Sequence, residues 1–107
     1  MSNLTYSPNE VRLMQYAEKI FAPLIHEGVF DNLERVFSAL LLDYIDRQIA
    51  LYKNKNNELE ARHQKSFDDF TASLKNRATP EQEEAWIDWE AARTFLRKWQ
   101  NIRKRVT

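Results

Sequence analysis

The amino-acid sequence predicts an all-α protein of three to four helices with a long central helix. The chain of 107 residues contains one glycine and three prolines, too few for the turns that a sheet protein needs roughly every eight to twelve residues. Helix-capping signals recur along the chain, and apolar residues recur at spacings of three and four. Because 43% of the residues are hydrophobic and 30% are charged, we expect an ordinary soluble protein that is folded rather than disordered.

The first helix is predicted over residues 8–27. Ser7 stands at the cap position, Pro8 at the first helical position and Glu10 three residues after the serine, which is the pattern of a capping box. Apolar residues then recur at helical spacing, at Met14, Ala17, Phe21 and Leu24.

Two residues near the carboxyl end of this segment affect where the helix stops. Pro23 predicts a kink or a break near Ala22, because proline removes one amide and crowds the preceding turn. Gly28 can end the helix, because glycine tolerates the left-handed backbone of a helix C-terminus.

Polar and apolar residues alternate ahead of the first cap. In an extended segment, Leu4 and Tyr6 face one side, and Asn3 and Thr5 face the other. A short N-terminal β-strand therefore stays open as an addition to the helices.

The second helix is predicted to begin after Asp31, with Glu34 at the third helical position. It is the most apolar part of the chain, with Leu33, Val36, Phe37, Leu40, Leu41, Tyr44, Ile45, Ile49 and Tyr52. Beyond these residues the helix either frays at residues 54–57 or continues to about His63. We favour continuation, because the glutamates and the arginine that follow are good helix formers.

Two further helix starts are visible in the carboxyl half. Ser66 with Asp69 predicts a third helix. Thr79, Pro80 and Gln82 repeat the capping-box pattern and predict a fourth helix.

All three tryptophans of the chain lie in the fourth predicted helix, among many charged residues. Trp86, Trp89 and Trp99 share one broad helix face with Phe95, and charged side chains occupy the other side. Burial of one such ring removes about 150–250 Å² from water, which stabilises by several kcal/mol at about 25 cal/mol per Å². The stripe is therefore expected to be covered, either by this chain or by another.

The sequence contains no catalytic motif, and we expect neither an enzyme nor a bound cofactor or metal. It has no cysteine and two histidines, and it lacks a glycine-rich phosphate loop. Glu60 and His63 lie one helical turn apart, as in half of a di-iron site, but the second half is missing. We interpret both as solvated helix residues.

Net charge and hydropathy bear on whether the protein binds nucleic acid, spans a membrane or is secreted. The net charge is zero, so the domain as a whole lacks the excess of basic residues that is typical of nucleic-acid-binding domains. The longest apolar run, residues 36–42, is far shorter than the roughly 18 residues of a membrane span, and the polar amino end has no signal-peptide character. We expect a cytoplasmic protein without a membrane partner.

Residues 27–45, "EGVFDNLERVFSALLLDYI", resemble the turn and second helix of ribbon-helix-helix proteins, with Glu34, Ala39 and Leu40 at the "ExxxxAL" positions. The resemblance implies a homodimer built on an intertwined two-stranded ribbon, whose polar face enters the DNA major groove. The implied dimer interface comprises Leu4, Tyr6, Val36, Phe37, Leu40, Leu41 and Tyr44. The implied nucleic-acid contacts are Asn3, Thr5 and Arg12.

Residues 65–100 resemble the tail of small prokaryotic antitoxin-like proteins that carry the pattern "SFEEF…T.EEE.DWWEWEA…L". The matching positions are Ser66, Phe67, Phe70, Thr79, Glu81, Glu84, Trp86, Asp88, Trp89, Glu90 and Ala91. The resemblance implies a dimerising region over residues 1–63 and a helical tail over residues 64–107, which is part of the same domain or a partner-binding arm. The implied contacts to a toxin-like partner are Phe67, Phe70, Trp86, Trp89, Phe95 and Trp99.

Three functional hypotheses follow. The first is a small non-enzymatic regulatory protein, antitoxin-like, that homodimerises and binds a protein partner through its C-terminal helices. The alternatives are a DNA-binding transcriptional regulator of the ribbon-helix-helix type and a purely structural helical protein. The aromatic residues of the tail distinguish the antitoxin-like hypothesis from the purely structural one. They contact a partner in the first case and pack within one chain in the second.

Overall fold

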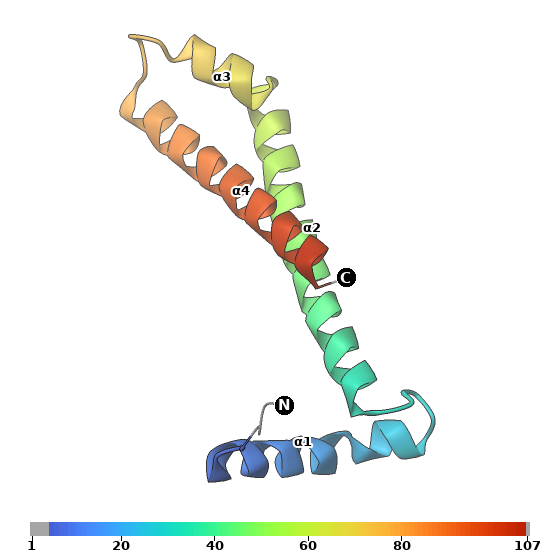
Figure 1. The fold of residues 1–107 in the computed structure, drawn as a ribbon. Coiled ribbons are helices and arrows are strands. Elements are labelled where there is room, and N and C mark those ends of the chain that lie inside the picture. Colours follow the sequence, from blue (N-terminus) through green and yellow to red (C-terminus); the bar gives the residue numbers. More distant parts are fainter. Residues whose placement is uncertain (1–4, 107) are drawn as a thin grey trace. The chain divides into compact units, whose positions relative to one another are not determined.

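The computed structural model describes residues 5–106, which form four α-helices and no strand (Figure 1). The helices are α1 (Pro8–His26), α2 (Leu33–His63), α3 (Phe67–Ser73) and α4 (Pro80–Arg105). The all-α prediction with a long central helix is confirmed. Thr5 and Tyr6 have no regular secondary structure, so the described residues give no support to an N-terminal strand. Asn3 and Leu4, the other two positions of that strand, lie outside the described residues.

The chain divides into two compact units, an N-terminal unit (Met1–Leu41) and a C-terminal unit (Leu42–Thr107). The division falls within α2. In the C-terminal unit, the second half of α2 packs with α3 and α4.

In α1, the predicted capping box is present. The Glu10 N–H donates to Ser7 Oγ at 3.2 Å, and the Ser7 N–H donates to the Glu10 carboxylate at 3.3 Å. These bonds satisfy amides that have no partner inside the helix, and such a cap contributes about 1 kcal/mol. The helix then continues to His26.

Of the kink or break predicted near Ala22, the break is absent, because α1 continues through Pro23. Pro23 lies in the last turn, where its carbonyl still accepts the Glu27 N–H at 3.0 Å. The helix ends three residues later at His26, and Gly28 follows with φ 75°. The Gly28 N–H donates to the Ile25 carbonyl at 3.0 Å, so the glycine closes the helix as predicted.

In α2, the cap residue is Asn32 rather than the predicted Asp31. Asn32 Oδ1 accepts the Arg35 N–H at 2.9 Å, because the helix begins at Leu33, one residue after the amide. The helix is continuous through residues 54–57, which confirms the favoured interpretation. Within this polar stretch, Asn56 Nδ2 donates to the Tyr52 carbonyl at 2.8 Å.

The caps predicted for α3 and α4 are also present. Ser66 Oγ accepts the Asp69 N–H at 3.1 Å. Thr79 Oγ1 accepts the Gln82 N–H at 3.2 Å, and the Gln82 side chain accepts the Thr79 N–H at 2.9 Å. Both helix starts are therefore fixed by local bonds.

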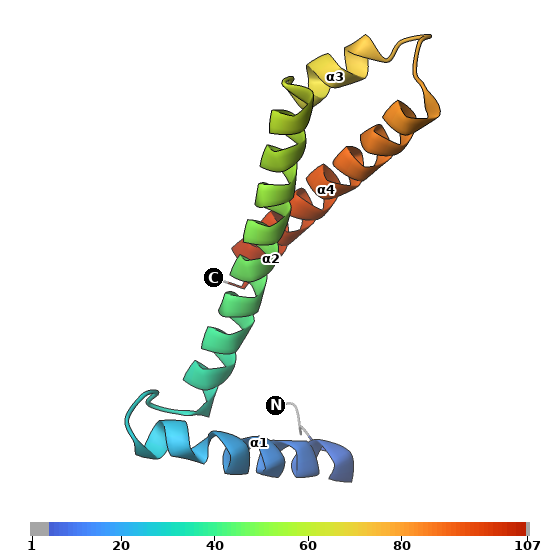
Figure 2. The same ribbon diagram turned by 180° about the vertical axis from the view of Figure 1, so that it is seen from behind.

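Within the C-terminal unit, α4 runs back along the second half of α2, as both views show (Figures 1 and 2). Tyr52 stacks on Phe95 with ring centroids 5.3 Å apart, and Tyr44 meets Trp99 edge-on at 5.7 Å. Next to these rings, Arg103 Nε donates to Asp46 Oδ1 at 2.8 Å. Aromatic contacts thus join the two helices along their length.

None of the helices within residues 5–106 combines the length and the apolar character that a membrane crossing requires.

Candidate interaction surfaces

The C-terminal unit has an aromatic core where α2, α3 and α4 meet. Leu59, Phe70 and Trp89 are buried there. Phe67, Leu74, Ala85 and Trp86 are partly buried and pack against them. The centre of the tryptophan stripe is therefore covered by this chain itself.

The six predicted partner-binding residues differ in how accessible they are. Trp89 is 2% exposed and Phe70 is 4% exposed, so neither offers surface to a partner in this conformation. Phe67, Trp86 and Trp99 are half-buried. Phe95 is the most accessible of the six, at 42% exposure.

His63, which the sequence analysis assigned to solvent, is half-buried and packs against the aromatic core. Its ring lies 4.4 Å from the Phe70 centroid and 5.7 Å from the Trp89 centroid. Its Nε2 atom is buried without a hydrogen-bond partner. The signal that identifies it is its spacing: His63 follows Leu59 by four residues, so both side chains lie on the helix face that meets α3 and α4.

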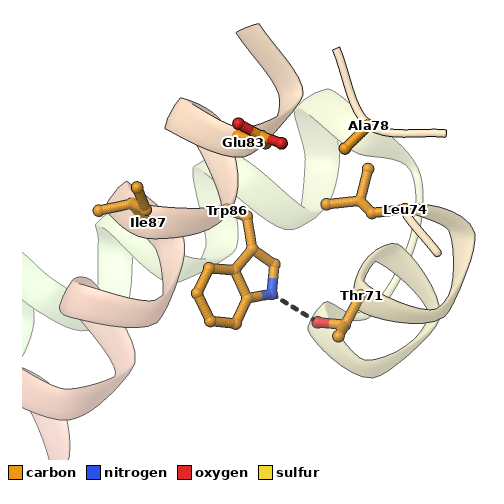
Figure 3. A pocket seen from close by; sticks show the side chains of 6 residues that line it. All are labelled: Thr71, Leu74, Ala78, Glu83, Trp86 and Ile87. Carbon is orange, nitrogen blue, oxygen red and sulfur yellow. Dashed lines mark hydrogen bonds between the residues drawn. The ribbon is translucent and has the colours of Figure 1, made fainter. Parts of the chain in front are cut away.

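Two successive hydrogen bonds position Trp86 against α3. Trp86 Nε1 donates to Thr71 Oγ1 at 2.8 Å (Figure 3). The Thr71 hydroxyl in turn donates to the Phe67 carbonyl at 2.9 Å. The indole N–H of a half-buried tryptophan thus has a defined partner, as such groups usually do. The bond ties α4 to α3.

Beside Trp86 lies a cavity of about 360 Å³ between α3, α4 and the segment that joins them (Figure 3). It is lined by Thr71, Leu74, Ala78, Glu83, Trp86 and Ile87. Ile87 is 60% exposed, although it is a large apolar residue. We call this cavity the α3–α4 cavity.

Arg93 lies over the ring of Phe67. Its guanidinium lies 4.2 Å from the Phe67 ring centroid and 3.9 Å from the Asp68 carboxylate. A cation over an aromatic face contributes about 0.5–1 kcal/mol at such an exposed site. Arg93 therefore supports the aromatic core from its solvent side.

The N-terminal unit exposes a continuous apolar face. A cavity of about 380 Å³ in this unit is lined only by apolar and aromatic side chains. These residues, which we call the N-terminal apolar face, are Leu13, Met14, Tyr16, Ala17, Ile20, Phe21, Leu33 and Phe37. Among the described residues of the unit, only Ala17 and Val36 are buried.

The predicted dimer residues lie partly on exposed surface. Tyr6, Phe37, Leu40, Leu41 and Tyr44 are 47–54% exposed, which leaves them free to contact another molecule. Val36 is completely buried inside the unit, and Leu4 lies outside the described residues.

The sequence analysis missed three exposed apolar residues of α1, namely Leu13, Tyr16 and Ile20. They recur at spacings of three and four, which places them on one helix face. That spacing was a sufficient signal for an interaction face on α1.

The predicted nucleic-acid contacts are not arranged as a ribbon in the part of the chain that is described. Thr5 is exposed and lies outside any helix or strand, and Arg12 is exposed on α1. Asn3 lies outside the described residues.

Within residues 5–106, no group of three or more His, Cys, Asp or Glu side chains is placed to hold a metal ion. Comparisons with protein-family models, with curated proteins and with solved structures found no match to this chain.

Proposed function

We propose that the chain is a small non-enzymatic regulatory protein of the antitoxin kind. In this proposal, two copies associate through the N-terminal apolar face, and the dimer binds a protein partner through α3 and α4. The observation that carries the proposal is the exposure of the N-terminal apolar face in a unit with so few buried residues.

The N-terminal unit has too little interior to be stable by itself. Chains of about 40 residues usually need disulfides, metals or oligomerisation, because they bury too small a share of their surface. The unit spans Met1–Leu41, and the chain has no cysteine. Association with a second copy is a source of the apolar burial that this unit lacks.

A second copy is a suitable occupant because the face has both a hollow and projecting side chains. The hollow is the cavity of about 380 Å³, and the most exposed residues on its lining are Leu13, at 66%, and Tyr16, at 60%. In a two-fold dimer the same patch serves both partners, so each copy places its projecting residues into the hollow of the other. Large exposed apolar patches are typical of such interfaces.

The test is the association state of the full chain, measured by sedimentation velocity over a range of concentrations. We expect a dimer for the unmodified protein and a monomer for Leu13→Glu and for Ile20→Glu, because a charge in the interface is desolvated without a partner. Leu51→Glu is the matched control, since Leu51 is also an exposed leucine, at 56%, but lies on α2 in the C-terminal unit. Helix content by circular dichroism confirms that each variant is folded.

A folded, monomeric wild-type protein at all concentrations would contradict the dimer. Equal loss of association in Leu51→Glu would show that the N-terminal apolar face is not the interface.

The resemblance of the tail to antitoxin-like proteins supports the second half of the proposal. The exposure of Ile87 and Phe95 on α4 leaves apolar surface available to a partner. The test is co-expression with the reading frame that lies beside this gene. We expect that frame to inhibit growth alone and to be neutralised by this protein; a frame that is harmless alone would contradict the proposal.

A further inference from the structure

We propose that the α3–α4 cavity binds a small organic cation with an apolar body, such as an alkylammonium or arylammonium ion. This inference is independent of dimerisation and of any protein partner. It follows from the size of the cavity, from the hydrogen bonds already made by its lining, and from its one charged residue.

The size and chemistry of the cavity are those of a small-molecule site. Its volume of about 360 Å³ lies within the range of roughly 300–1,000 Å³ that is typical of ligand pockets. Leu74, Ala78, Ile87 and the Trp86 ring supply an apolar wall. The body of the ligand is therefore apolar.

The side chains of the lining have no hydrogen left to donate. The Trp86 N–H is bonded to Thr71, and the Thr71 hydroxyl is bonded to the Phe67 carbonyl. The remaining lining residues are aliphatic, apart from Glu83, which only accepts hydrogen bonds when it is ionised. A ligand that carries a donor is favoured over one that carries an acceptor.

Glu83 supplies the charge. Figure 3 shows its carboxylate at the edge of the cavity, above Trp86. Within the described residues, this carboxylate makes no hydrogen bond and no ion pair, and its backbone N–H is used in the helix cap with Thr79. Lys75 and Arg77 are exposed residues of the nearby segment that do not line the cavity. An ammonium group on the ligand complements the negative charge of the Glu83 carboxylate at this edge of the cavity.

Trp86 adds a second attraction for a cation. The face of an indole ring attracts ammonium ions through its quadrupole. The bond to Thr71 holds the ring in place, so binding a cation does not require the ring to be ordered first. Glu83 and Trp86 both belong to α4, three residues apart, which fixes their separation.

The experiment compares three probes of similar size on the full-length protein: phenethylammonium, neutral 2-phenylethanol and anionic phenylacetate. Binding is followed by the indole N–H resonances in ¹H–¹⁵N NMR spectra, with the Trp86 signal assigned by its loss in Trp86→Phe. We expect phenethylammonium to bind about tenfold more tightly than 2-phenylethanol, which is the usual effect of a charge-assisted hydrogen bond, and phenylacetate to bind weakest.

Glu83→Gln keeps the shape of the side chain and removes its charge. We expect this variant to lose most of the preference for phenethylammonium over 2-phenylethanol, so that only the smaller contribution of the Trp86 ring remains. Glu84→Gln is the matched control, because Glu84 is the next residue of α4, is exposed and does not line the cavity; this variant should keep the preference for the cation.

Three results would overturn the inference. They are the absence of any shift of the Trp86 signal with all three probes, equal binding of the amine and the alcohol to the unmodified protein, and an unchanged preference in Glu83→Gln. None of these results depends on whether the protein dimerises or has a protein partner.

Discussion

His63 lies almost parallel to Trp89, with ring centroids 5.7 Å apart and ring planes 18° apart. Phe70 also packs against the imidazole at 4.4 Å, and the Phe70 and Trp89 centroids are 5.4 Å apart, so the three rings form one cluster. The buried Nε2 atom has no hydrogen-bond partner. The stacking stabilises the core, whereas the unpaired nitrogen destabilises it.

We expect His63→Phe to stabilise the protein by about 1 kcal/mol. The substitution keeps an aromatic ring, while it removes a buried polar atom whose unpaired burial costs about 1–3 kcal/mol. The phenylalanine ring is larger than the imidazole, and the resulting overpacking offsets part of the gain in stability. The free energy of unfolding is measured by urea denaturation monitored by circular dichroism.

His63→Gln is the informative second variant, because it removes the ring and keeps a polar group. We expect it to be less stable than the unmodified protein. Equal stability of all three proteins would show that the imidazole is not part of the core.

The bond between Trp86 and Thr71 predicts a loss of stability in Thr71→Val. Valine has nearly the shape of threonine, but it leaves the Trp86 N–H without its partner at 2.8 Å. The expected loss is about 1 kcal/mol, the usual effect of leaving a partly buried donor unpaired. Thr94→Val is the matched control, because the Thr94 hydroxyl makes an exposed bond to Glu90 at 3.4 Å.

A double-mutant cycle with Trp86→Phe isolates this bond. The loss caused by Thr71→Val should be smaller in the Trp86→Phe background, since no indole N–H remains to be left unpaired and only the bond from the Thr71 hydroxyl to the Phe67 carbonyl is lost. Additive losses would contradict a direct interaction.

Trp89 and Phe95 predict a contrast that separates core residues from surface residues within one helix. Trp89→Ala should destabilise by about 3–5 kcal/mol, because Trp89 is 2% exposed and its removal leaves a large void. Phe95→Ala should cost much less, because Phe95 is 42% exposed and its main ring contact is the stack on Tyr52. Thermal unfolding of both variants measures the contrast, and equal shifts would contradict the described packing.

The helix starts could be predicted from the sequence because capping is local. Ser7 with Glu10 and Thr79 with Gln82 each form bonds over three residues, which no distant part of the chain can change. The start of α2 was misplaced by one residue because Asp31 and Asn32 are both good caps and stand side by side.

The side-chain environments could not be predicted in the same way, because periodicity shows that a helix face is apolar but not what covers it. Met14 and Ala17 belong to one predicted stripe, yet Ala17 is buried and Met14 is 44% exposed. The partial burial of His63 depends on α4, which is distant in sequence, as well as on the neighbouring α3. Glu83 likewise becomes part of a cavity only because Thr71 and Trp86 bring α3 and α4 together.

The junction between α2 and α3 gives the last prediction. Gln64 directly follows α2 and has φ 54°, in the left-handed region that glycine adopts without strain. At such a position, a residue with a side chain destabilises the folded protein by about 1–2 kcal/mol through steric strain. Glycine avoids this strain but destabilises by about 0.5–1 kcal/mol, because it gives the unfolded chain more conformational freedom. Gln64→Gly should therefore stabilise by about 0.5–1 kcal/mol in urea denaturation.

Asn76→Gly is the control for this prediction. Asn76 also has positive φ, at 61°, but asparagine tolerates the left-handed region better than glutamine does. We expect a smaller gain than at Gln64, or none. A larger gain at Asn76 than at Gln64 would show that the strain does not lie at the end of α2, because the two substitutions change the unfolded chain in nearly the same way.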